Sequence, residues 1–260
     1  MARIKQSICI PMFTSPPASM TLEAICRAAA EIGFPAVEFW RPEEDFEEQV
    51  ALAKRHGLRV ASFTGHAQGG LNSRADHELV EKQLRASIAL AAKHDIPGVI
   101  CLSGNRQPDR TRQEAIEITT EGLRRVAPYA EEMGVNANLE VLNSKVNHKG
   151  YDCDRTDWAV AVLELVDSPR VRLLYDIYHM QIMEGDVIRT IQQNIHWIGH
   201  FHTAGNPGRR DLDDEQELNY AGICRAIAGT GYRYFVGHEL KPKGDVIEAL
   251  RTTFRICDVG

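Results

Sequence analysis

Short apolar runs alternate with longer amphipathic segments along the whole chain. Runs of four to eight apolar residues are typical of buried strands, whereas apolar residues three or four positions apart are typical of one face of a helix. The runs predict eight strands, at residues 7–10, 36–40, 58–63, 98–102, 135–141, 171–176, 197–202 and 232–239. Helices are expected between and after them, at residues 21–33, 43–56, 76–94, 111–133, 156–166, 185–193, 220–228 and 246–256.

Eight strand–helix units in 260 residues predict an α/β fold of the (β/α)₈ barrel type, with residues 1–260 as a single domain. The structural alternative is an open, doubly wound parallel sheet. That fold typically has a Gly-rich phosphate loop after its first strand. Here the position is taken by the loop at residues 11–18, which begins Pro-Met-Phe-Thr-Ser-Pro-Pro and cannot serve as such a loop.

Four polar residues end successive predicted strands in the second half of the chain. They are Glu140, Asp176, His202 and Glu239, separated by 36, 26 and 37 residues, about one strand and one helix each time. The carboxyl ends of all strands meet at one mouth of a barrel. Side chains alternate between the two faces of a strand, and these four positions are compatible with the inward face. We therefore expect the four side chains to converge on one site.

Three carboxylates so close together raise one another's pKa unless a cation lies among them. Three oxygen ligands and one imidazole suit Mn²⁺ or Mg²⁺, with Co²⁺ or Zn²⁺ as alternatives. Any one of these acidic residues could instead cap a helix or pair with an arginine elsewhere. Four in register at successive strand ends favour a metal site. His200, on the same face as His202, is expected to be packed and hydrogen-bonded below the metal.

Further residues near the predicted strand ends are candidates for binding a substrate. They are Glu38, Trp40, His66, His179, Arg209 and Lys241. An arginine can hold a carboxylate by a forked contact, and a lysine can attract an anion. Each candidate keeps an alternative: Glu38 could pair with a charge and Trp40 could belong to the core. His179 could orient a metal ligand or lie on the surface, and the two basic residues could be solvated charges.

The composition narrows the class of protein. Charged residues make up 25% of the chain and the hydrophobic class 43%, which is ordinary for a globular protein. The net charge of −6 argues against a nucleic-acid partner. Six scattered cysteines without a C-x-x-C pair favour the reducing cytoplasm over a disulfide framework or a zinc knuckle. The first apolar run, residues 8–13, is too short for a signal peptide or a membrane span, so no membrane partner is expected.

The residues at the strand ends resemble those of the xylose isomerase-like TIM-barrel superfamily, and within it the hydroxypyruvate isomerase family. The resemblance covers essentially the whole chain. It rests on Asn138-Leu139-Glu140, on residues 175–186 (YDIYHMQIMEGD), on Pro207-Gly208-Arg209, on Glu217-Leu218-Asn219-Tyr220 and on Glu239-Leu240-Lys241-Pro242. It implies a divalent metal on Glu140, Asp176, His202 and Glu239. His202 stands where hydroxypyruvate isomerases tend to have Gln, and the His form is similar to that of ketose 3-epimerases.

The resemblance also implies an activity, the isomerisation of hydroxypyruvate to tartronate semialdehyde. Glu140 and Glu239 are then the acid/base pair that moves a proton next to the carbonyl, and the metal stabilises the enediolate. The alternatives are a ketose 3-epimerase, a lyase or dehydratase on the same metal, a metal-assisted nuclease, and a barrel that only binds a sugar. A nuclease should have more His ligands and a basic face, and the pI near 5.9 argues against it. A small hydroxy-carbonyl or sugar substrate and a homo-oligomer are expected.

Overall fold

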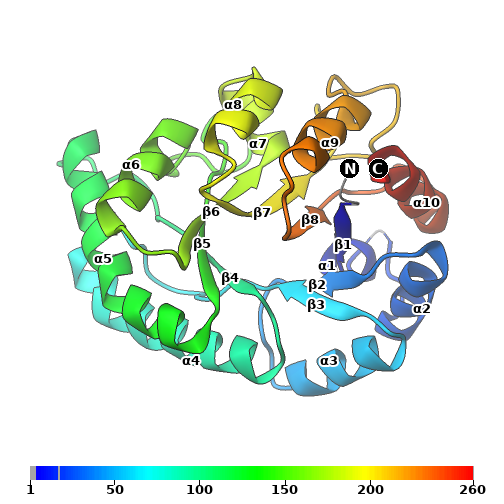
Figure 1. The fold of residues 1–260 in the computed structure, drawn as a ribbon, viewed down its shortest axis with the longest axis horizontal. Coiled ribbons are helices and arrows are strands. Elements are labelled where there is room, and N and C mark those ends of the chain that lie inside the picture. Colours follow the sequence, from blue (N-terminus) through cyan, green and yellow to red (C-terminus); the bar gives the residue numbers. More distant parts are fainter. Residues whose placement is uncertain (1–3, 17, 260) are drawn as a thin grey trace.

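The computed structural model describes residues 4–16 and 18–259, so Pro17, in the predicted loop at residues 11–18, lies outside the described residues. Eight parallel strands form its centre and helices surround them (Figure 1). The strands are β1 Lys5–Cys9, β2 Ala36–Glu38, β3 Arg59–Ser62, β4 Gly98–Cys101, β5 Asn136–Glu140, β6 Val171–Asp176, β7 Ile198–Thr203 and β8 Phe235–His238.

The strands are hydrogen-bonded in the order β3-β2-β1-β8-β7-β6-β5-β4. The two end strands, β3 and β4, approach each other through a parallel bridge between Thr64 and Ile100. Ile100 also exchanges backbone hydrogen bonds with this segment, from its N to Phe63 O (2.8 Å) and from Gly65 N to its O (2.8 Å). The sheet is therefore a nearly closed barrel, and the predicted (β/α)₈ fold is confirmed.

Helices follow the strands as predicted, with somewhat different bounds, but a short helix also lies in the predicted loop at residues 11–18, where none was expected. The helices are α1 Pro11–Thr14, α2 Leu22–Ile32, α3 Phe46–Arg55, α4 His77–Lys93, α5 Arg112–Met133, α6 Thr156–Val166, α7 Ile177–Met183, α8 Val187–Asn194, α9 Tyr220–Gly229 and α10 Val246–Cys257. A short 3₁₀ helix, η1 Arg74–Asp76, precedes α4.

Local interactions explain where helix α2 begins and ends. Thr21 caps the start of α2 by accepting a hydrogen bond from Ala24 N (3.2 Å), and Gly33 ends the helix with a left-handed φ of 111°.

The predicted helix at residues 185–193 corresponds to α8, which starts two residues later than predicted. A separate helix between β6 and α8, α7, was not predicted. Asp176 caps α7 by accepting the backbone N–H of His179 (2.9 Å), so this helix begins directly at the end of β6. Gly185 and Asp186 have φ values of 72° and 45°, and this left-handed pair separates the two helices.

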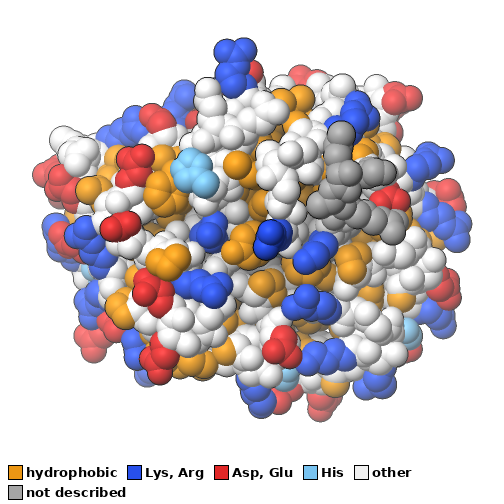
Figure 2. Space-filling model, in the orientation of Figure 1, with side chains coloured by type: hydrophobic (Ala, Val, Ile, Leu, Met, Phe, Trp, Pro, Cys, Tyr) orange, Lys and Arg blue, Asp and Glu red, His pale blue; other side chains and the backbone are white. Residues whose placement is uncertain are grey.

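The core lies between the strands and the helices, and inside the barrel. The interior of a barrel of this kind is filled by side chains. The space-filling view shows atoms covering the centre of the face it presents, with no open channel there (Figure 2). Trp158, Tyr175 and Phe201 are among the largest fully buried side chains. Inside the barrel the buried side chains include polar ones, among them Ser7 and His200. All six cysteines are buried and free. In the part of the chain that the structure describes, no helix is long and apolar enough to cross a membrane.

Candidate metal centre

The structure brings together the four side chains predicted to converge. Glu140 and Asp176 are the last residues of β5 and β6, His202 lies near the end of β7, and Glu239 directly follows β8. The strand register places Asp176 opposite His202 and His202 opposite Gly237. One possible ligand atom from each of the four residues lies within 4.8 Å of the others, and all four residues are buried. The cluster therefore forms at the carboxyl end of the barrel.

The imidazole of His202 has two different environments. Its Nε2 lies 3.0 Å from Glu38 Oε2. Its Nδ1 lies 3.3 Å from Glu140 Oε1, 3.3 Å from Glu239 Oε2 and 4.0 Å from Asp176 Oδ2, but it is buried without a hydrogen-bond partner. A carboxylate only accepts hydrogen bonds, so Nε2 donates to Glu38, and in the neutral ring the lone pair of Nδ1 faces three carboxylates. This donor set fits a divalent ion, which removes the repulsion.

The electrostatics of the site favour a positive charge at this point. Burial lowers the pKa of His202, yet contacts with Glu140, Glu239 and Glu38 together raise it well above its usual value. Burial also raises the pKa of Asp176, with Arg209 acting in the opposite direction. At His202 the carboxylates outweigh the effect of burial, whereas at Asp176 Arg209 offsets only part of the cost of a charge that water no longer stabilises. A cation among the carboxylates would serve the same purpose.

Two donors hold the carboxylate of Glu239. Arg209 donates to Oε2 (2.5 Å) and the indole N–H of Trp40 donates to Oε1 (3.3 Å). Burial raises the pKa of Glu239, but Arg209 and then His202 lower it well below its usual value. Arg209 itself adopts a left-handed backbone, with φ 58°, and its carbonyl accepts the N–H of Lys241 (2.7 Å). The loop after β7 thus aims a guanidinium at the site.

His179 lies beside the cluster and is fully buried. Asn143 Nδ2 donates to its Nδ1 (2.5 Å), so the proton of the neutral ring lies on Nε2. That Nε2 is 3.6 Å from Asp176 Oδ2 and has no hydrogen-bond partner. Burial, and then Arg209, keep the pKa of His179 well below its usual value. A neutral imidazole with a free donor therefore lies next to the predicted ligands.

The other residues predicted to bind a substrate line three neighbouring cavities. A cavity of about 590 Å³ opens on the cluster, and its lining includes Glu38, Trp40 and Arg209. His66 and Lys241 line two neighbouring cavities that share Trp40 with each other. His66 Nε2 accepts the N–H of Leu102 (2.9 Å). Trp40 is 47% exposed, so it forms part of the wall rather than of the core.

The cavity also has lining residues that the reasoning from sequence did not select as site residues. These are Cys9, Asn72, Asn105, Gln107, His148 and Tyr151, among others. Tyr151 joins two loops, because its hydroxyl donates to Glu140 O (3.0 Å) and accepts Ser103 N (3.0 Å). Cys9 ends β1, so the rule that selected the four ligands would have found it. The others lie in long loops, for which strand periodicity gives no signal.

An eight-stranded parallel barrel with its polar cluster at the carboxyl ends of the strands is a TIM barrel. The model of the family described as "Xylose isomerase-like TIM barrel" matches residues 26–256, and the chain belongs to that family. It is 30% identical over 243 residues to the human "Putative hydroxypyruvate isomerase", covering 88% of this chain and 87% of that protein. It is 31% identical over 226 residues to the "2-oxo-tetronate isomerase" of Cupriavidus necator, covering 83% and 85%.

Solved structures give the same picture of the fold. The "AP endonuclease, family 2" of Brucella melitensis superposes with a TM-score of 0.83 at 25% identity, covering 96% of this chain and 97% of that one. An "L-ribulose 3-epimerase" superposes with a TM-score of 0.81 at 22% identity, covering 98% and 93%, and shows the fold alone. The family predicted from the sequence is confirmed, and the predicted enzyme class, an isomerase, agrees with both curated relatives.

Proposed function

We propose that the chain is a metal-dependent isomerase of a small hydroxy-carbonyl substrate, interconverting hydroxypyruvate and tartronate semialdehyde. One observation carries the proposal. Glu140 from β5 and Glu239 from β8 reach the same point, each with an oxygen 3.3 Å from Nδ1 of His202, at the base of a cavity of about 590 Å³. Two carboxylates facing one reacting group are what a proton transfer next to a carbonyl requires.

The reaction relocates two protons and needs no co-reactant. A proton leaves the hydroxymethyl carbon and a proton returns to the former carbonyl carbon. The hydroxyl proton meanwhile passes from one oxygen to the other through an enediolate. Glu239 is held ionised by Arg209 and is therefore ready to accept the carbon proton, with Glu140 as its partner in the transfer. Positioned acid–base groups of this kind contribute about 10²- to 10⁴-fold to the rate.

A divalent ion held by Glu140, Asp176, His202 and Glu239 would polarise the carbonyl and stabilise the negative charge of the enediolate. Arg209 and His179 supply the remaining contacts in this proposal. The Nε of Arg209 and the Nε2 of His179 are buried and have no partner in the described structure. Leaving such donors unpaired is costly, and a substrate carboxylate or hydroxyl would satisfy them.

A ketose 3-epimerase is the second candidate. His202 favours it, because a His at this ligand position is similar to the ligand set of ketose 3-epimerases. The cavity is also large for a three-carbon acid, and its lining includes the amides Asn72, Asn105 and Gln107, which suit a chain of hydroxyl groups. Both reactions would use the same two glutamates, so only the substrate separates them.

The test is turnover by chelator-treated protein with Mn²⁺ or Mg²⁺ added back. Hydroxypyruvate, a 2-oxo-tetronate, ketopentoses, ketohexoses and DNA with an abasic site form the panel. Glu239→Gln is compared with Glu132→Gln, an exposed glutamate on α5. We expect metal-dependent isomerisation that is lost in the first variant and kept in the second. Turnover of ketoses alone would favour the epimerase, cleavage of DNA would favour a nuclease, and metal-independent turnover would refute the mechanism.

A further inference from the structure

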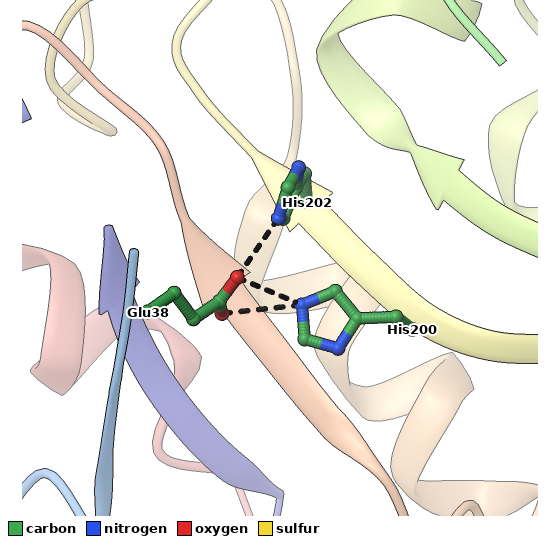
Figure 3. Close-up of side chains that lie close together, drawn as sticks. All are labelled: Glu38, His200 and His202. Carbon is green, nitrogen blue, oxygen red and sulfur yellow. Dashed lines mark hydrogen bonds and ion pairs between the residues drawn. The ribbon is translucent and has the colours of Figure 1, made fainter. Parts of the chain in front are cut away.

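A buried carboxylate reaches across the barrel to the histidines of β7. Glu38 belongs to β2, which is separated from β7 by β1 and β8 in the sheet. Its Oε2 accepts from His202 Nε2 (3.0 Å), and both of its oxygens lie 3.1 Å from His200 Nε2 (Figure 3). Its Oε1 also accepts from the hydroxyl of Ser7. Glu38 is only 1% exposed. Both carboxylate oxygens are therefore buried and hydrogen-bonded to protein donors.

The strands between β2 and β7 leave room for this contact. On β8, the residue facing His202 is Gly237. A Cβ at Gly237 would lie 2.1 Å from Glu38 Oε1 and 3.0 Å from His202 Cδ2. On β1, the small side chain of Ser7 adds a hydrogen bond instead of filling the space. Three strands thus contribute to placing one carboxylate against one imidazole.

The contact determines which nitrogen of His202 is free. Because a carboxylate only accepts, Nε2 keeps its proton, and in the neutral ring that binds metal the lone pair of Nδ1 is directed at Glu140, Asp176 and Glu239. We propose that Glu38 is a positioning residue, which fixes the ring and the tautomer of His202 so that Nδ1 can hold a divalent ion. Ser7 and His200 in turn fix Glu38. The inference rests on the metal site of the proposed function.

The same geometry allows a different interpretation, in which a second metal ion is bound directly by Glu38 and the two histidines. The test must distinguish this interpretation from a positioning role of Glu38. Glu38, His200 and His202 themselves form a second group of potential metal ligands. An ion there would need His202 Nε2 as a ligand, and a nitrogen cannot both coordinate an ion and donate its proton to Glu38. The distances of 3.0–3.1 Å are those of ordinary hydrogen bonds, which favours protons over an ion. One ion for each chain is therefore expected.

The first measurement is the dissociation constant and stoichiometry of Mn²⁺, by calorimetry on chelator-treated full-length protein. Glu38→Gln keeps the size of the side chain but loses its charge, and we expect affinity to fall about 10- to 100-fold. Ser7→Ala leaves the contact with His202 and should have a smaller effect. Glu23→Gln is the matched control, since Glu23 contacts His56 Nε2 at 2.8 Å on the surface in another carboxylate–imidazole pair. Its affinity should equal that of the wild type.

Two spectroscopic measurements distinguish a positioning role of Glu38 from a role in stability alone, because loss of stability alone would change neither of them. In the Zn²⁺-loaded wild type, long-range ¹⁵N–¹H correlations should show the proton on Nε2 of His202. In the Co²⁺-loaded protein, Glu38→Gln should change the visible absorption bands while circular dichroism shows the fold retained. A folded Glu38→Gln with wild-type Mn²⁺ affinity, a proton on Nδ1, or two ions per chain would each overturn the inference.

These results also separate the inference from the proposed function. If the wild type binds one ion and Glu38→Gln binds it weakly, but hydroxypyruvate is not turned over, the positioning role stands and the substrate is wrong. If turnover is found and Glu38→Gln binds metal normally, the isomerase stands and only the role of Glu38 fails. If the wild type binds no divalent ion, both are overturned.

Discussion

Gly237→Ala is predicted to destabilise the protein strongly, although the change adds a single methyl group. The backbone of Gly237 is not in the left-handed region, so alanine meets no conformational strain there. The obstacle is space, because the new Cβ would lie 2.1 Å from Glu38 Oε1 and 2.9 Å from Glu38 Cδ. Ordinary contacts begin at 3.4 Å, so the carboxylate must move by roughly 1.3 Å.

The size of the effect follows from what that movement breaks. Glu38 is held at 3.0–3.1 Å by His200 and His202, and a shift of this size takes at least one contact beyond hydrogen-bond range. A lost hydrogen bond to a charged group costs about 1.5–3 kcal/mol. Overpacking a dense interior costs a further ~1–3 kcal/mol. We therefore expect the free energy of unfolding to fall by about 3–5 kcal/mol, a large part of the usual ~5–15 kcal/mol.

The assay is urea unfolding followed by circular dichroism, with Gly229→Ala as the matched control. Gly229 is exposed at the end of α9, and a Cβ added there would have no neighbour within 4 Å. Alanine there should leave stability unchanged or raise it by about 0.4–1 kcal/mol. If Gly237→Ala unfolds at the same urea concentration as the control, the carboxylate is not packed against β8 as described, and the reasoning is refuted.

Three further predictions concern catalysis, pH and a helix end. Arg209→Met should lower kcat/KM and move the acid limb of its pH profile to higher pH, since Arg209 lowers the pKa of Glu239, the proposed base. Arg210→Met should change neither. Burial lowers the pKa of His238 to about 3, so below pH 6.5 the unfolded state binds a proton that the folded state does not. Stability should fall by roughly 2–3 kcal/mol between pH 7 and 4.5, and urea unfolding of His238→Asn should show a smaller loss. Thr111→Ala removes the capping box of α5 and should cost about 1 kcal/mol in thermal or urea unfolding, with activity unchanged.

The alternation of strands and helices could be predicted from the sequence because it depends on neighbours along the chain. Apolar runs of period two and amphipathic segments of period 3.6 differ locally, and caps such as Thr21 act within three residues. The strand ends were also visible, and with them Glu140, Asp176, His202 and Glu239. The fold then required them to share one mouth, because every parallel strand of a barrel ends at the same side.

The partners of each side chain depended on the tertiary structure. Trp40 and Glu239 are 199 residues apart, yet they share a hydrogen bond because β1 pairs with both β2 and β8 and brings the ends of these strands close together. Glu38 was selected from the sequence as a substrate contact or a charge pair, whereas the structure surrounds it with two imidazoles. The need for glycine at position 237 is likewise invisible in the sequence, because it arises from a carboxylate two strands away. Sequence periodicity fixes which face a side chain points to, but only the closed barrel decides what it meets there.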